Sequence, residues 1–182
     1  MKFEICFPFV GDSIGGSHVS AFLLIKELKA KGHKVKIILH EKNILSKYLI
    51  KKKIDFEILK LSKFPEKGFY FLNLLYFLFI NFFTIRNYLN KNNFDIIHGN
   101  DLRVNLCWGF ANIGLKNFVW HQRNFLKKKS FMNMMIYLFS NHVIAISETV
   151  YECFPKFLRK KVKIIYNPFE KYKLKTKSRK YL

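Results

Sequence analysis

His121 and Arg123 stand two residues apart in a polar segment, residues 120–124, that follows an apolar run. A histidine at the carboxyl end of a strand and beside an arginine is more typical of a functional site than of a core. A guanidinium fork suits phosphate and carboxylate oxygens, so Arg123 is predicted to contact a phosphate or an acceptor. The competing interpretation is that the cluster only pins the loop that follows.

A glycine-containing loop, Gly11–Gly16, connects the first apolar run to a helical stretch that begins at Ser17. Glycines let the backbone approach a ligand closely, and a helix N-terminus offers unpaired N–H groups to an anion. Gly11, Gly15 and Gly16 do not have the G-x-G-x-x-G spacing of dinucleotide-binding proteins. A plain tight turn explains the loop equally well.

Two further polar segments also follow apolar runs. Asn100 and Asp101 come after the run 94–98, and Ser147 comes after the run 142–146. Asn100 and Asp101 are candidates for direct substrate contact, although Asp101 also suits the N-cap of the next helix. Ser147 has the same two candidate roles, a ligand contact and a helix N-cap, and the two can coexist.

Short strand-like runs alternate with longer helical ones along the chain, which is typical of β-α-β units. Gly32 is expected to end the first helix, with Ser17 as its N-cap. The expected strands are residues 2–10, 35–39, 56–61, 94–98, 116–120, 142–146 and 162–166, and the expected helices 17–31, 69–90, 102–113, 131–140 and 147–157, the last broken at Pro155. The pattern predicts a Rossmann-like, doubly wound and mainly parallel α/β sheet with ligands at the carboxyl ends of its strands.

The length of 182 residues fits one domain, which we expect to span residues 1–168, followed by a basic linker or tail, residues 169–182. The three cysteines lie far apart in apolar segments, without metal-ligand or redox spacing. This pattern favours buried, reduced thiols in a cytoplasmic protein. Neither a metal nor a bound cofactor is expected.

Lysine and arginine total 33 against 12 acidic residues, a formal net charge of +21. Such an excess attracts an anionic membrane surface, nucleic acid or a phosphorylated substrate. The aromatic residues lie in runs that look buried, and no RNA-binding motif is present, so no specific nucleic acid partner is expected. An anionic membrane is the favoured surface.

The start of the chain lacks the pattern of a secretory signal. Phe69–Ile85 is a charge-free apolar run of about the minimum membrane-spanning length, interrupted by polar residues. A buried or membrane-contacting amphipathic helix is the favoured interpretation of this run. The protein is therefore expected in the cytoplasm, peripheral on the inner face of a bacterial membrane.

The order of these segments resembles the N-terminal domain of GT-B glycosyltransferases, specifically the retaining family 4. The resemblance rests on the loop Gly11–Gly16, Phe94–Asp101, Val143–Glu148 and Asn167-Pro168, and it covers about 168 of the 182 residues. It implies the N-terminal half of a GT-B fold, whose C-terminal, donor-binding half is absent. A fragment, a truncated gene product and one half of a two-chain enzyme all remain open.

The resemblance also implies roles for individual residues. It places Gly15 and Gly16, with Ser17 and His18 behind them, near the donor phosphates and the acceptor. It places His121 close to the transferred sugar, where it would position and stabilise rather than form a covalent intermediate. Many family members have a Glu-Arg pair where this chain has Ser17-His18, so the contacts of these two residues depart from the family pattern.

The expected function is transfer of a sugar from a nucleotide-sugar, as substrate, to a lipid-linked or cell-surface polysaccharide acceptor such as lipopolysaccharide or capsule. The chain alone is expected to be inactive and to need a C-terminal GT-B half in cis or in trans. The alternative function is a non-catalytic basic α/β module that binds a membrane surface or a partner.

Overall fold

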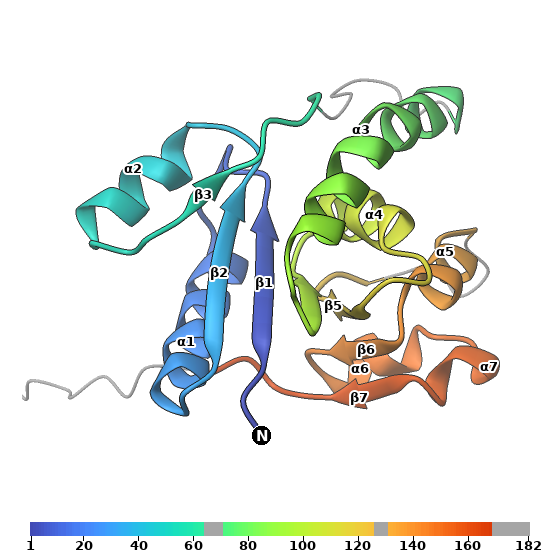
Figure 1. Ribbon diagram of the computed structural model, residues 1–182. Coiled ribbons are helices and arrows are strands. Elements are labelled where there is room, and N and C mark those ends of the chain that lie inside the picture. The colour runs from blue at the N-terminus through green and yellow to red at the C-terminus, as the bar shows by residue number, and fades with distance from the viewer. Residues whose placement is uncertain (64–70, 126–130, 169–182) are drawn as a thin grey trace, which may run out of the picture.

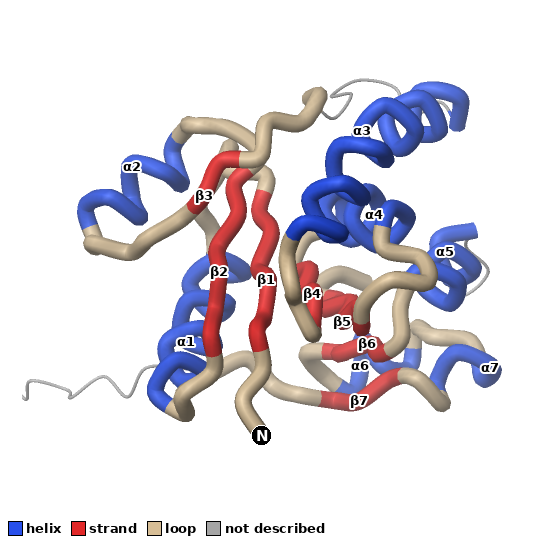
Figure 2. Tube along the Cα trace, in the orientation of Figure 1, coloured by secondary structure: helices blue, strands red, loops and turns tan. Residues whose placement is uncertain are grey.

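Seven strands form a single parallel sheet in the computed structural model, which describes residues 1–63, 71–125 and 131–168 (Figures 1 and 2). The order across the sheet is β3-β2-β1-β4-β5-β6-β7, and every neighbouring pair is parallel. The strands are β1 Glu4–Phe9, β2 Lys34–Leu39, β3 Glu57–Ile58, β4 Ile96–Gly99, β5 Asn117–Gln122, β6 His142–Ala145 and β7 Val162–Ile164. The strand order reverses between β1 and β4, which is where ligands bind in open α/β sheets.

Helices cover both faces of this sheet. They are α1 Gly16–Ala30, α2 Ile44–Lys51, α3 Phe71–Lys91, α4 Leu102–Ala111, α5 Phe131–Phe139, α6 Glu148–Glu152 and α7 Lys156–Arg159. The first two pack on one face with β1 and β2, and α3, α4 and α5 pack on the other (Figure 1). The expected doubly wound α/β fold is confirmed.

Successive side chains along a strand point to opposite faces of the sheet, which explains why a core forms on each face. In β1, Ile5, Phe7 and Phe9 point into the core beneath α1 and α2, whereas Cys6 points into the core beneath α3 and α4. Both faces of a parallel sheet are buried, so consecutive strand residues are apolar and only their direction alternates. Cys6 and Cys107 are buried and unpaired, and burial raises the pKa of both thiols.

The first helix does not begin where the sequence suggested. Ser17 was expected to be the N-cap of α1, but the N-cap is Gly15, and Ser17 lies inside the helix. The ring of His18 accepts a hydrogen bond from Gly15 N–H (3.1 Å), so the first turn is stabilised from within the helix. Gly32 ends the helix as expected, with a φ of 84° that favours glycine.

Other boundaries shift by a few residues. The helix α2 was not predicted, and β3 is shorter than the predicted strand 56–61. The strand β5 extends to Gln122, so His121 belongs to the strand rather than to the loop after it. The break at Pro155 is confirmed, because α6 ends before it and α7 begins after it.

Two sequence predictions fall partly or wholly outside the described residues. The apolar run Phe69–Ile85 begins outside them, and the predicted tail 169–182 lies outside them entirely. Among the helices of the described ranges, none combines the length and hydrophobicity needed to cross a membrane.

Candidate active site at the carboxyl edge of the sheet

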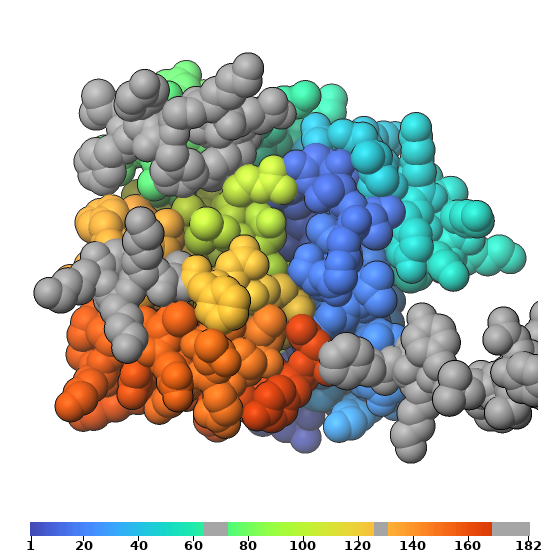
Figure 3. All heavy atoms as spheres, turned by 180° about the vertical axis from the view of Figure 1, so that it is seen from behind, coloured from blue at the N-terminus to red at the C-terminus, as the bar shows by residue number. Residues whose placement is uncertain are grey.

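Segments that follow four strands bring polar side chains to the carboxyl edge of the sheet. The loops after β1 and β4 carry Asp12 and Asn100, the end of β5 leads into Arg123, and Asn167 follows β7. The space-filling view from behind shows the end of the described chain lying against the first helix (Figure 3). Residues from both ends of the sequence therefore meet at this edge.

Arg123 holds three of these loops together. Its Nη1 donates to Asn167 Oδ1 (2.7 Å) and to Ser20 Oγ (3.2 Å), and its Nη2 donates to Asn100 Oδ1 (3.1 Å). Ser20 Oγ–H in turn donates to Asn167 Oδ1 (3.0 Å). One guanidinium thus joins α1, the loop after β4 and the segment after β7.

The oxygens around Arg123 are all neutral. Within the described ranges no carboxylate forms an ion pair with it, and its Nε is buried without a hydrogen-bond partner. Burial lowers the pKa of Arg123 to about 10, because water no longer solvates the charge fully. The group stays positive at neutral pH, and an anion placed beside it would meet an uncompensated charge.

His98 and His121 stack beside this cluster with their ring centroids 5.4 Å apart. His98 Nε2 and His121 Nδ1 are 3.3 Å apart and share one hydrogen bond, and His121 Nε2 is buried without a partner. Burial, and then the nearby charge of Arg123, lowers the pKa of His98 to about 3 and that of His121 to about 2. Both imidazoles are therefore neutral at pH 7, and His121 keeps one buried ring nitrogen without a hydrogen-bond partner.

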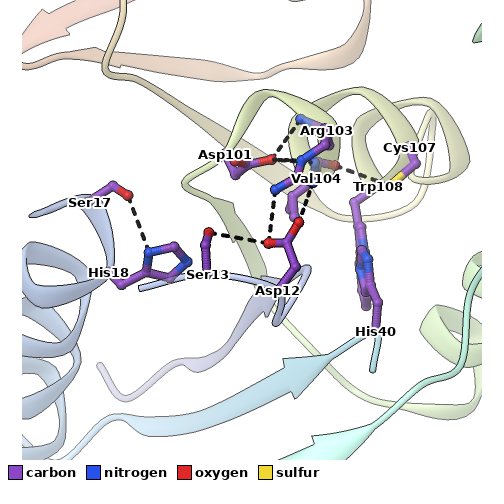
Figure 4. Close-up of polar contacts among 10 residues, drawn as sticks. All are labelled: Asp12, Ser13, Ser17, His18, His40, Asp101, Arg103, Val104, Cys107 and Trp108. Carbon is purple, nitrogen blue, oxygen red and sulfur yellow. Dashed lines mark hydrogen bonds and ion pairs between the residues drawn. The ribbon is translucent and has the colours of Figure 1, made fainter. Parts of the chain in front are cut away.

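Asp12 and Arg103 close the other end of the site (Figure 4). Arg103 Nη1 and Nη2 donate to the two carboxylate oxygens of Asp12 (2.5 and 3.1 Å), and its Nε donates to Asp101 Oδ1 (3.3 Å). The hydrogen bond from Arg103 lowers the pKa of Asp12, and the same bond raises that of Arg103. Here the positive charge is balanced by two carboxylates.

A small pocket of about 130 Å³ opens beside this ion pair. Polar side chains of Asp12, His40, Ser62 and Lys63 line it, and Phe77 supplies an apolar wall. His40 is buried and accepts a hydrogen bond from Trp108 Nε1 (2.8 Å), and burial lowers its pKa to about 3. The pocket therefore offers donors and acceptors of the kind that sugar hydroxyls need.

The glycines of the loop after β1 do different things. Gly11 has a φ of 102°, and a Cβ there would lie 2.9 Å from the backbone oxygen of Glu41, so only glycine fits. A Cβ at Gly15 or Gly16 would meet nothing within 4 Å. There is thus open space beside both glycines in front of α1, and the ligand contacts expected for them stay a prediction.

The structure brings Asn100, Arg123 and His121 together at this edge. Asp101 caps α4 by accepting from Arg103 N and Val104 N, and Ser147 caps α6 by accepting from Val150 N (3.2 Å). His18 is half-buried, its ring 5.6 Å from that of Phe9, and the Ser17 hydroxyl lies 3.5 Å from His18 Nδ1. The cap positions are confirmed; the ligand contacts expected for these residues stay predictions.

Sequence reasoning missed four residues of the site. Asp12, Ser20 and Arg103 were not singled out, and Asn167 was noted only as part of the family pattern. A carboxylate next to the glycine loop and an arginine two residues after Asp101 were visible signals. The hydrogen bond between Ser20 and Asn167 leaves no signal in the sequence, because 147 residues separate the two.

The family model for Glycosyltransferase Family 4 matches residues 14–171. The chain belongs to this family. The matched segment contains every residue of the edge described above except Asp12 and Gly11. Membership confirms the resemblance on which the expected fold and residue roles were based.

Solved glycosyltransferases share the fold. The Anabaena protein Alr3699/HepE in complex with UDP-glucose superposes with a TM-score of 0.66 and 17% identity, over 92% of this chain and 44% of that one. Acinetobacter baumannii MurG gives 0.63 and 17%, over 94% and 47%, and the lipopolysaccharide outer core galactosyltransferase WaaB gives 0.57 and 15%, over 91% and 46%. At these identities the likeness shows the GT-B fold alone.

The family 4 chain spans less than half the length of these structures and corresponds to the N-terminal half of the GT-B fold. No curated protein matches its sequence. In the described part of the chain, no three histidine, cysteine or acidic side chains are grouped so that they could hold a metal ion.

Proposed function

We propose that this family 4 chain is the acceptor-side half of a retaining glycosyltransferase. It would move a sugar from a nucleotide-sugar to a lipid-linked or cell-surface polysaccharide acceptor such as lipopolysaccharide or capsule. The observation that carries the proposal is the contrast within one edge: a half-buried Arg123, which forms no ion pair with a carboxylate of the described residues, lies beside a neutral His121 with one unpaired nitrogen. The first suits an anion and the second suits a hydroxyl.

Each residue then has a definite task. Arg123 attracts a phosphate oxygen of the nucleotide-sugar. This oxygen gives the guanidinium the negatively charged acceptor that its neutral partners do not supply. Beside Gly15, whose N–H is bonded to His18, the backbone N–H of Gly16 at the N-terminus of α1 would donate to the same anion. The pocket beside Asp12 and Arg103 receives acceptor hydroxyls, since its own charges are already balanced.

His121 contributes a hydrogen bond rather than a proton. With a pKa of about 2 it is neutral and cannot act as a general acid at pH 7. Its Nδ1 is engaged by His98, so Nε2 is the atom left to hold a hydroxyl of the transferred sugar. Positioning of this kind raises the rate when it aligns the sugar with the acceptor.

The proposal includes the need for a second half. The neighbouring chains are about twice as long as this one, and the HepE structure is a complex with UDP-glucose. The donor-binding groups expected from the family pattern would come from a C-terminal half, supplied in cis or in trans. Without it we expect no transfer.

The test is a transfer assay with a panel of nucleotide-sugars and a lipid-acceptor extract. The chain is assayed alone and with the C-terminal half of a family 4 enzyme added in trans, and we expect transfer only in the mixture. In the mixture, His121→Ala should lower kcat/KM by about 10- to 100-fold, the loss typical of one well-placed hydrogen bond. The matched control is His142→Ala at the amino end of β6, which should leave the rate unchanged.

Two outcomes would count against the proposal. Transfer by the chain alone would refute the need for a second half. Equal losses for His121→Ala and His142→Ala would refute the role given to this edge. A chain that is silent in every mixture, yet binds membranes, would instead favour the non-catalytic alternative.

A further inference from the structure

The helix α3 has two apolar sides, of which only one faces the core. Leu74, Phe77, Leu78, Ile85 and Leu89 are buried. The opposite side carries five exposed apolar residues, Leu75, Tyr76, Phe79, Ile80 and Phe83, which we call the aromatic stripe. Tyr76, Phe79 and Phe83 keep 69%, 66% and 63% of their side-chain surface exposed. A stripe of large aromatic residues in water is unfavourable unless another phase covers it.

Exposed apolar side chains continue from α3 towards α5 and α7. Ring contacts join Phe82 of α3 to Phe110 of α4 (5.2 Å) and Phe110 to Phe139 of α5 (5.6 Å). Tyr137 of α5 then contacts Phe157 of α7 (5.7 Å). The three helices lie along the same side of the molecule in Figure 1. Their exposed residues outside the stripe include Met134, Tyr137, Leu138 and Phe157.

This side of the molecule is positive. The helices α3, α4, α5 and α7 contain no aspartate or glutamate, whereas α7 and the residue after it contribute Lys156, Arg159 and Lys160. Lys156 and Lys160 are exposed. The acids that border this surface include Glu152 before α7, Asp101 at the N-cap of α4, Glu57, which accepts a hydrogen bond from Tyr88 near the end of α3 (3.1 Å), and Asp95, in a pocket with Leu138 of α5. Aromatic side chains between lysines match the boundary of an anionic bilayer, where apolar rings and lipid phosphates are a few ångströms apart.

A second copy of the chain fits this surface less well. A two-fold interface would bring identical patches together, and the same lysines would then face each other without acids to compensate them. A bilayer supplies the opposite charge and the apolar layer at once. Since no described helix can cross a membrane, contact would be confined to the surface.

We propose that the outer sides of α3, α5 and α7 form a docking face for an anionic lipid bilayer. The aromatic stripe enters the interfacial layer, and Lys156 and Lys160 contact lipid phosphates. Phe77, which lines the pocket beside Arg103, is on the buried side of α3, whereas the aromatic stripe is on the exposed side, so docking leaves the candidate active site accessible. The inference does not depend on the transfer activity, since binding to lipid can be measured on the chain alone.

The test is sedimentation of the full chain with vesicles of phosphatidylcholine, with and without phosphatidylglycerol. We expect binding to the mixed vesicles and much weaker binding to the neutral ones. The triple variant Tyr76→Ser/Phe79→Ser/Phe83→Ser should reduce the partition coefficient at least tenfold, because three exposed aromatic rings no longer enter the interface. Ile44→Ser/Ile50→Ser is the matched control, as it removes exposed apolar residues from α2 on the other side of the sheet.

A charge-reversal pair sharpens the test. Lys156→Glu/Lys160→Glu should weaken binding to the mixed vesicles by about tenfold or more, since each basic residue near the surface contributes about 1 kcal/mol, a factor of about five. Lys47→Glu/Lys51→Glu on α2 makes the same change in net charge and should have a much smaller effect. Equal losses of vesicle binding in the two double variants would show that binding depends only on the net charge of the protein. That result would overturn the docking face.

Two other results would overturn it as well. One is unchanged partition of the stripe variant, and the other is a dimer of the wild-type chain, by light scattering, that the stripe variant turns into a monomer. The latter would assign the stripe to a second copy. Thermal unfolding of each variant checks that the exposed substitutions leave the fold intact.

Discussion

Arg103 and Arg123 lie at the same edge of the sheet, but the oxygens that hold them differ in charge. Arg103 is bound by the carboxylates of Asp12 and Asp101, while Arg123 is bound by the neutral oxygens of Ser20, Asn100 and Asn167. The half of the site around Arg103 is therefore complete by itself. The half around Arg123 has a positive charge and two unpaired nitrogen atoms, on Arg123 and His121, for a ligand to complete.

The largest expected effect is a loss of stability in acid, which should come from the half of the site around Arg123, where His98 and His121 lie. His98 and His121 are held neutral with pKa values of about 3 and about 2, against 6.5 when unfolded. Below pH 6.5 the unfolded state binds more protons than the native one, so stability present at pH 7 is lost as the pH falls towards 3. The slope approaches about 1.4 kcal/mol per pH unit for each group well below pH 6.5, so the loss is about 3 kcal/mol for both between pH 6.5 and 5.

Urea unfolding at pH 7, 6 and 5 measures this loss. The variant His98→Gln/His121→Gln should show a smaller dependence on pH than the wild type, although His40, also buried and neutral, retains its own contribution. The Asp12 carboxylate, whose pKa is lowered, should not contribute until the pH falls to about its unfolded value of 3.8. A wild-type stability that stays level from pH 7 to 5 would contradict neutral buried imidazoles.

The loop Gly11–Gly16, which also carries Asp12, should tolerate a larger side chain at Gly15 but not at Gly11. Gly11→Ala forces a Cβ to within 2.9 Å of the Glu41 oxygen at a positive φ and should cost about 3 kcal/mol of stability. Gly15→Ala meets open space and should change stability by about 0.5 kcal/mol or less. Comparing the two midpoints of denaturation tests this, and equal values would mean that the loop relaxes around Gly11.

Effects smaller than that of Gly11→Ala should come from the polar partners of the two arginines. Asn167→Ala leaves Arg123 and Ser20 without their shared acceptor in a half-buried place and should cost about 1 to 2 kcal/mol. Asp12→Asn weakens an ion pair whose side chains are about a third exposed and should cost about 1 kcal/mol or less. If Asp12→Asn proved the more damaging in unfolding experiments, the contrast between the halves would be reversed.

The sheet and most helices were predictable because their signal is local. Apolar residues recur with the period of a strand or a helix, and Gly32, Asp101 and Pro155 mark ends that local backbone chemistry requires. The helix α2 escaped prediction because it has only eight residues and begins within a run of polar ones. The start of α1 was misplaced because the ring of His18, not a serine hydroxyl, satisfies the first turn.

The candidate site was predictable in its parts and not in its connections. Residues that directly follow strands, such as Asn100 and Arg123, could be placed at the carboxyl edge from the pattern alone. Which side chains meet there depends on the conformations of several loops at once. Asp12 and Arg103, for example, are 91 residues apart, and neither gives any local indication of the other.

The hydrogen bond between Ser20 and Asn167 has a consequence for how the protein is made. A ribosome releases α1 and the first strands long before residue 167. The Ser20 hydroxyl, and later the Arg123 guanidinium, stay without this partner until the chain has been synthesised past β7. The β1–β2 side of the sheet can pack early in translation, but the ligand-facing edge is assembled only when the domain is nearly finished. A nascent chain interrupted before residue 167 would thus hold a folded scaffold and an unfinished site.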